Sequence, residues 1–237
     1  MDSCTNNIRQ WLVPTNCLLC ETQVDSGSKV CPACLEALPY NYHPTCHRCA
    51  LPLEDPKNTL CGQCQQHPPA WDFALSTFSY THPIDKLIQS MKFHDKLDVA
   101  YLLGTLMHNF IKSHYLIHKR KLPELLIPVP LHRTRLRERG FNQAIELARP
   151  LSQHFAISIN KHACQRTVAT KPQSDLNMHD RARNLRQAFQ ADVIPVSHVA
   201  IIDDVMTTGH TIEEVSKSLR FAGVKQIDVW VCARAQK

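Results

Sequence analysis

Residues 199–211 read VAIIDDVMTTGHT: an apolar run, two carboxylates and a threonine-rich turn. The first four residues are typical of a strand buried on both faces, and a helix is expected over residues 211–222, ending at Gly223. Gly209 allows a tight turn between them, so that backbone N–H groups and the positive end of the helix dipole can face one anion. The pattern predicts a phosphate-binding turn; the alternative is an incidental strand–turn–helix with a capping threonine.

Two adjacent carboxylates, Asp203 and Asp204, follow the expected strand. Carboxylates accept hydrogen bonds from vicinal hydroxyl groups, either directly or through Mg²⁺, and the nearby threonine hydroxyls can donate to a phosphate. A phosphate held beside a diol is the chemistry of a ribose 5-phosphate. Ligands of parallel α/β sheets bind at the carboxyl ends of the strands, so this stretch predicts a site for a phosphorylated sugar.

The rest of the chain after residue 70 alternates apolar strands with amphipathic helices. Strands are expected at residues 71–80, 125–129, 199–202 and 226–233, and helices at 83–93, 97–117, 141–154 and 211–222, with Asn142 as an N-cap. Strands that are apolar on both faces and alternate with helices imply a parallel sheet covered on both sides. The predicted fold class is therefore α/β.

Eight of the 11 cysteines lie between Cys17 and Cys64, in four Cys-x2-Cys pairs. Two such pairs complete the tetrahedron that Zn²⁺ prefers, so the spacing predicts two closed, structural zinc sites rather than a disulfide framework or a redox Cys-x-x-Cys. Metal binding would supply much of the folding energy of so small a module. Sequential pairing makes the ligand sets Cys17, Cys20, Cys31, Cys34 and Cys46, Cys49, Cys61, Cys64, and a cross-braced arrangement of the same residues is the alternative.

Charge and cysteine content divide the chain near residue 70. Residues 1–70 carry 4 basic and 6 acidic groups, and residues 71–237 carry 23 basic and 15 acidic groups, a net of −2 against +8. We therefore expect a small Cys-rich domain over 1–70 and a basic α/β domain over 71–237. Neither a signal peptide nor an apolar run of membrane-spanning length is found, which favours the cytoplasm, where thiols stay reduced and bind metal.

Residues 199–211 resemble the phosphoribosyl-pyrophosphate (PRPP) motif of type I phosphoribosyltransferases. The resemblance implies that fold for residues 71–237, with Asp203 and Asp204 on the ribose hydroxyls as the catalytic pair. It also implies that PRPP is bound by the rest of the motif, namely Val205, Met206, Thr207, Thr208, Gly209, His210 and Thr211, with residues 207–211 around the 5-phosphate.

Two further stretches, together with the Cys-rich double zinc ribbon, narrow the resemblance to the ComF/GntX-like family. Residues 128–143 (PVPLHRTRLRERGFNQ) resemble the loop after that family's first core strand, and residues 166–189 resemble its mobile-loop pattern. In transferases of this fold the first loop grips pyrophosphate and its Mg²⁺, a task that suits the planar fork of arginine. The PRPP contacts implied here are Pro130, Arg133, Arg139, Arg166 and Lys92. A solvated basic surface is the alternative for any one arginine of the first loop, and an exposed lysine is the alternative for Lys92. Residues 166–186 suit a lid that closes over substrate.

The resemblance implies a role in natural transformation. The expected protein binds PRPP with Mg²⁺ and single-stranded DNA, in the cytoplasm or peripherally at the inner face of the membrane, with partners from the competence machinery such as a DNA helicase. The basic domain agrees, because cations that neutralise phosphates release counterions. One alternative is an active phosphoribosyltransferase that moves ribose 5-phosphate from PRPP to a nitrogen acceptor. Another is a zinc-ribbon adaptor that docks proteins, which an intact PRPP motif makes the weakest reading. No segment of the head resembles a purine or pyrimidine pocket.

Overall fold

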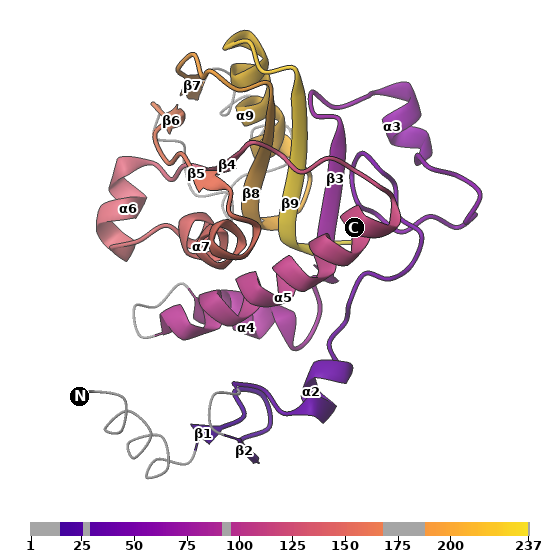
Figure 1. Cartoon of the computed structure of the whole chain (residues 1–237), viewed down its shortest axis with the longest axis vertical. Coiled ribbons are helices and arrows are strands. Elements are labelled where there is room, and N and C mark those ends of the chain that lie inside the picture. The colour runs from indigo at the N-terminus through magenta and orange to yellow at the C-terminus, as the bar shows by residue number, and fades with distance from the viewer. Residues whose placement is uncertain (1–14, 26–28, 92–95, 168–187, 237) are drawn as a thin grey trace. The chain divides into compact units, whose positions relative to one another are not determined.

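The computed structural model describes residues 15–25, 29–91, 96–167 and 188–236, which divide into two compact units (Figure 1). The smaller unit is Met1–Pro39 and the larger is Tyr40–Lys237. In the described part of the smaller unit, β1 (Thr15–Asn16) pairs antiparallel with β2 (Gln23–Val24), and α2 (Pro32–Glu36) follows. Its buried apolar side chains besides Cys17 are Val30 and Leu38, so this unit has little core with which to fold without a metal.

A five-stranded sheet forms the centre of the larger unit. Its strands are β3 (Phe73–Ser79), β4 (Leu125–Pro128), β5 (Ser158–Ile159), β8 (His198–Met206) and β9 (Gln226–Arg234). They lie in the order β3-β9-β8-β4-β5, and every neighbouring pair is parallel (Figure 1). The α/β class with a parallel sheet is therefore confirmed. The two-residue edge strand β5 was not expected, because so short a run carries no periodicity.

Helices cover both faces of this sheet. They are α4 (Ile84–Ser90), α5 (Leu97–Ile117), α7 (Gln143–Phe155) and α9 (His210–Phe221). Val199 and Ile201 of β8 belong to one buried cluster with Ile212 and Val215 of α9. The other face packs against α5 and α7, where the ring of Tyr115 meets that of Trp230 at 5.5 Å. Alternation along the strands thus separates two cores, as period-2 side chains require.

Two segments differ from the sequence prediction. The strand expected at 199–202 continues to Met206, so Asp203 and Asp204 lie within β8 rather than beyond it. The arginine-rich stretch expected to be a loop forms a helix, α6 (Arg133–Arg139), which ends at Gly140 with a positive φ of 76°. A short antiparallel pair, β6 (Cys164–Arg166) with β7 (Phe189–Ala191), packs near α9. None of the helices within the described ranges is long and apolar enough to cross a membrane.

The chain divides at Pro39 and Tyr40, whereas the composition suggested a boundary at residue 70. The reason is that residues 40–70, which include α3 (Gly62–Gln66), attach to the edge of the sheet. The Asn41 N–H donates to the Thr77 carbonyl at 2.9 Å, and the Ala74 N–H donates to the His47 carbonyl at 2.8 Å. The second cysteine cluster therefore belongs to the same compact unit as the sheet.

Candidate functional site

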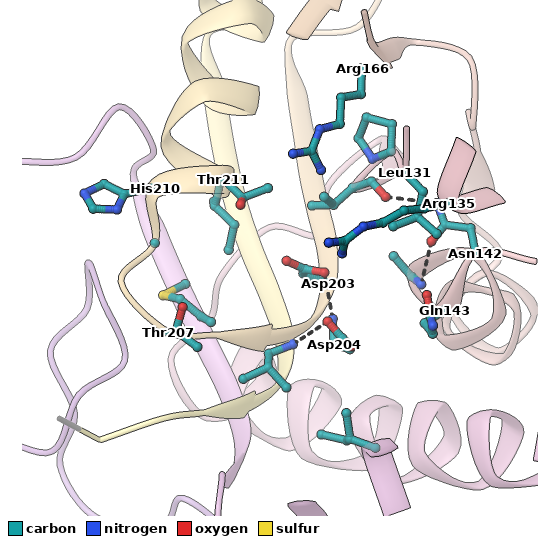
Figure 2. A pocket seen from close by; sticks show the side chains of 18 of the residues that line it. Leu131, Arg135, Asn142, Gln143, Arg166, Asp203, Asp204, Thr207, His210 and Thr211 are labelled. Carbon is teal, nitrogen blue, oxygen red and sulfur yellow. Dashed lines mark hydrogen bonds between the residues drawn. The ribbon is translucent and has the colours of Figure 1, made fainter. Parts of the chain in front are cut away.

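A cavity of about 300 Å³ opens at the carboxyl end of β8 (Figure 2). The whole stretch from residue 203 to residue 212 lines it, and the opposite wall comes from the segment after β4, from α6, from the start of α7 and from β6. Of the residues singled out in the sequence outside that stretch, the cavity brings together Pro130, Arg139 and Arg166. Arg133 does not line it, and Lys92 and the lid expected at residues 166–186, apart from its first two residues, lie outside the described residues.

The carboxylates of Asp203 and Asp204 form one wall. Asp203 Oδ1 accepts the Asp204 N–H at 2.9 Å, and Asp204 Oδ1 accepts the Val205 N–H at 2.8 Å. Burial, together with the neighbouring Asp204, raises the pKa of Asp203 well above its usual range. The charged form of Asp203 is therefore disfavoured, and hydroxyl donors or a cation in the cavity would stabilise it.

The turn after the carboxylates, residues 207–211, exposes backbone that a ligand can approach closely. Gly209 has a φ of 80°, which strains any larger residue, and a Cβ placed on it would lie only 3.2 Å from the Trp71 ring, which would have to shift slightly. Thr208 Oγ1 lies 2.9 Å from His210 Nδ1. The twelve-residue helix α9 starts at once after Gly209, so its N-terminal N–H groups lie at the cavity wall.

Helical geometry selects which arginines reach the cavity. Residues four apart share a face of a helix, and Arg135 and Arg139 are such a pair and both line the cavity. Arg133 and Arg137, the other pair, are exposed. Sequence reasoning did not single out Arg135, although its spacing from Arg139 was the available signal once the segment was taken as a helix.

Three guanidinium groups converge on the carboxylate wall. Figure 2 shows those of Arg135 and Arg166 turned toward Asp203. Burial, and then the charge of Arg135, lowers the pKa of both Arg139 and Arg166. Three positive charges that lie close together in a half-buried space repel one another. A bound polyanion would neutralise them, so this part of the cavity suits a polyanionic ligand.

Two amides at the start of α7 complete the wall, and neither was singled out in the sequence as a ligand contact. Asn142 caps α7 by accepting the Ala144 N–H at 2.9 Å, and its Nδ2 donates to the Val129 carbonyl at 3.0 Å. The N-cap prediction is thereby confirmed. Gln143 is buried, and its Nε2 has no hydrogen-bond partner among the described residues. An amide donor left unpaired beside the cavity is available to a bound ligand.

Arg234, at the end of β9, ties the turn to the second cysteine cluster. Its Nε donates to the Cys49 carbonyl at 2.8 Å, and its Nη1 donates to the Met206 carbonyl at 2.8 Å and to the Thr207 carbonyl. Trp71 lies against Gly209 and contacts Arg48, which stands between Cys46 and Cys49. The Arg48 guanidinium donates to the Trp71 carbonyl, and the Trp71 indole N–H donates to the Arg48 carbonyl. The second cluster therefore helps to position the turn, a link that no local sequence pattern indicates.

The eight cysteines form two groups, Cys17, Cys20, Cys31, Cys34 and Cys46, Cys49, Cys61, Cys64, with all ligand atoms of a group within 4.8 Å of one another. The sequential pairing is confirmed. The Cys20 and Cys31 sulfurs are 3.7 Å apart, as are those of Cys49 and Cys61. Sulfurs at about 2.3 Å from a tetrahedral Zn²⁺ are separated by about 3.8 Å, so both groups fit one structural zinc ion each.

Comparison with known proteins gives matches that cover up to 94% of the chain. Residues 8–65 match the family described as the double zinc ribbon domain. Competence protein F of Haemophilus influenzae is 38% identical over 179 residues, 74% of this chain and 78% of that protein. The DNA utilization protein YhgH of Escherichia coli K12 is 33% identical over 230 residues, 94% of this chain and 98% of that protein. A purine phosphoribosyltransferase from Pyrococcus horikoshii matches in structure with 14% identity over 68% of this chain and 87% of that one, at a TM-score of 0.28 that carries no argument.

Proposed function

Because this chain belongs to the family of competence protein F and the DNA utilization protein YhgH, we propose that it binds PRPP with Mg²⁺ and handles single-stranded DNA during DNA uptake in the cytoplasm. One observation is the main support for PRPP as the ligand. A carboxylate pair, a glycine turn at a helix N-terminus and three guanidinium groups surround a single cavity of about 300 Å³.

Each wall suits one part of PRPP. Asp203 and Asp204 accept hydrogen bonds from the vicinal hydroxyls of the ribose. The N–H groups and hydroxyls of residues 207–211 bind the 5-phosphate, as at other helix N-termini. Arg135, Arg139 and Arg166 bind the pyrophosphate, each able to donate two parallel hydrogen bonds. Mg²⁺ bound with the ligand would offset the charge of its phosphate oxygens.

The DNA half of the proposal draws on the names of the relatives and on charge. Residues 71–237 carry a net +8, of which three arginines are used by the cavity. The remaining cations are available to nucleic-acid phosphates, and their neutralisation would release counterions from the strand.

We expect PRPP with Mg²⁺ to raise the melting temperature of the chain by about 5–10 °C at a hundred times its Kd. Asp203→Ala combined with Asp204→Ala should abolish the shift, because the ribose then loses its acceptors. The control is Glu54→Ala with Asp55→Ala, which removes an exposed adjacent pair and should leave the shift intact. A wild-type chain with no shift would refute the ligand assignment.

The second candidate is an active transferase. It is favoured by the unpaired amide of Gln143 beside the cavity, which could hold an acceptor. In that reaction the C1–O bond to pyrophosphate breaks, a nitrogen nucleophile forms the new bond to C1, and the arginines stabilise the leaving pyrophosphate. Incubation with PRPP and a panel of bases separates the two functions. Release of pyrophosphate that depends on one base establishes the transferase, and its absence across the panel leaves the binding protein.

A further inference from the structure

A second cavity of about 650 Å³ lies in the larger unit and shares no lining residue with the first. Its walls come from three places: the segment of residues 40–59 beside the second cysteine cluster, the middle of β3, and the last three turns of α5. The size is that of cavities that bind organic ligands. Nothing proposed so far uses it.

Three aromatic rings form one wall. Tyr40 and Tyr42 stack with centroids 5.1 Å apart and planes 26° apart, and Phe110 of α5 lies 5.8 Å from Tyr42 and 6.4 Å from Tyr40. Tyr40 is anchored on Phe78 of β3 at 4.8 Å. Tyr42, in contrast, is 75% exposed. An ordered ring stack that ends in an open aromatic face is a surface on which a further planar ring can stack.

The other walls are polar but carry no negative charge. No described residue that lines the cavity is an aspartate or a glutamate, so a cationic ligand has no carboxylate partner there. The side chains of the lining residues Asn58, Asn109 and Ser113 carry hydrogen-bond donors and acceptors. Burial lowers the pKa of His114 to about 4, so that this ring is neutral at pH 7.

The chemistry of these walls matches a nucleobase: a planar ring for stacking, with hydrogen-bonding edges and no charge. An exposed lysine, Lys119, directly follows the lining residue His118 at the end of α5. A cation beside an aromatic cavity that has no carboxylate in its lining suits a strand whose bases enter and whose phosphates stay in solvent.

We infer that this cavity binds bases of single-stranded DNA, which stack on Tyr42 and Phe110 while the phosphates stay in solvent near the exposed Lys119. The inference rests on the proposed function, because it names the surface on which the DNA of that function binds. It also separates the two ligands in space, with PRPP at the carboxyl end of β8 and DNA between the ribbon segment and α5.

The test measures binding of a fluorescent twenty-nucleotide oligothymidine to the full zinc-loaded chain by anisotropy, over a series of salt concentrations. Tyr42→Ala should weaken binding about 5- to 100-fold, the range of one lost base stack. The slope of affinity against salt should not change, since no phosphate contact is removed. Tyr42→Trp should retain affinity. Tyr101→Ala removes a tyrosine that is 51% exposed on α5 outside the cavity, and it should bind like the wild type.

The outcomes separate this inference from the proposed function. If the wild type does not bind the oligonucleotide even at low salt, the DNA half of the proposed function is wrong and the inference falls with it. If the wild type binds and Tyr42→Ala binds equally well, the function stands and this site is wrong. Displacement of the oligonucleotide by an equal nucleotide concentration of thymidine monophosphate would show a site for free nucleotides and would also overturn the inference. Melting temperatures of the variants check that each one is folded.

Discussion

The Asp203 carboxylate lowers the stability of the folded chain, although the proposed PRPP binding requires it. Burial and the adjacent Asp204 raise its pKa well above the usual range, so its charged form is less favourable in the folded chain than in the unfolded one. The ionisation of Asp203 therefore costs stability; this cost shrinks as the pH falls below the raised pKa and is gone below the pKa that the group has in the unfolded chain. Residues held in such positions are common at functional sites.

Asp203→Asn should raise the melting temperature of the ligand-free chain at neutral pH, because the amide keeps an acceptor oxygen without the charge. The stability difference between variant and wild type should shrink as the pH is lowered through the raised pKa. PRPP affinity should fall about tenfold or more, the usual effect of losing a charged hydrogen-bond partner. Thermal melts from neutral to acidic pH and calorimetric titration measure the two effects. Asp55→Asn on the exposed ribbon segment is the control, and a variant no more stable than the wild type at neutral pH would contradict the argument.

At the scale of the element, α6 shows how secondary structure selects residues. Four arginines occupy every second position of Arg133–Arg139, and in an extended segment with its period of two they would all point to one side. In the helix, positions 135 and 139 share the face toward the cavity, and positions 133 and 137 are exposed. The helix therefore assigns different roles to residues that are chemically identical.

Arg135→Ala should weaken PRPP binding about 10- to 100-fold, the range for hydrogen bonds to charged groups. Arg133→Ala removes the same charge two residues earlier and should change the affinity less than about threefold, because exposed charges are screened. Calorimetric titration with PRPP and Mg²⁺ measures both. Equal losses in the two variants would show that overall charge, rather than the helical face, governs binding.

At the scale of the whole molecule, the two cysteine groups differ in what they support. One belongs to Met1–Pro39, and the other belongs to the unit that holds the sheet. Arg234 connects the second group to the turn, through the Cys49 carbonyl at one end and the Met206 carbonyl at the other. Metal at the second group is thus expected to hold the PRPP site in shape.

Cys34→Ser and Cys61→Ser should each reduce the zinc content from two ions to about one per chain. Only Cys61→Ser, in the second group, should also weaken PRPP binding, by about tenfold or more if the turn loses its anchor. Metal analysis by mass spectrometry and calorimetric titration are the measurements. Arg234→Lys tests whether unfolding alone explains the loss of affinity. This variant should keep both zinc ions and still bind PRPP more weakly. Equal PRPP affinity in the two cysteine variants would contradict the link.

Features that depend on local pattern were predictable from the sequence. Short continuous apolar runs identified the strands of the parallel sheet, and apolar residues at helical spacing identified the long helix over residues 97–117, which the structure places at Leu97–Ile117. Cysteine spacing identified both ligand groups, because a Cys-x2-Cys pair places two sulfurs near each other whatever the rest of the chain does. That residues 203–211 line one cavity was predictable for the same reason, since they are consecutive in the chain.

Only the tertiary structure decided the rest. The segment RTRLRER has a single apolar residue, Leu136, so hydrophobic periodicity could not reveal its helix or favour Arg135. The Arg234–Cys49 hydrogen bond spans 185 residues, and the wall of Tyr40, Tyr42 and Phe110 joins a ribbon segment to a distant helix. Local propensity and metal spacing act between near neighbours in the chain. Which distant side chains come to share a cavity depends on how the packed elements bury their apolar faces, and that emerges only when the whole chain folds.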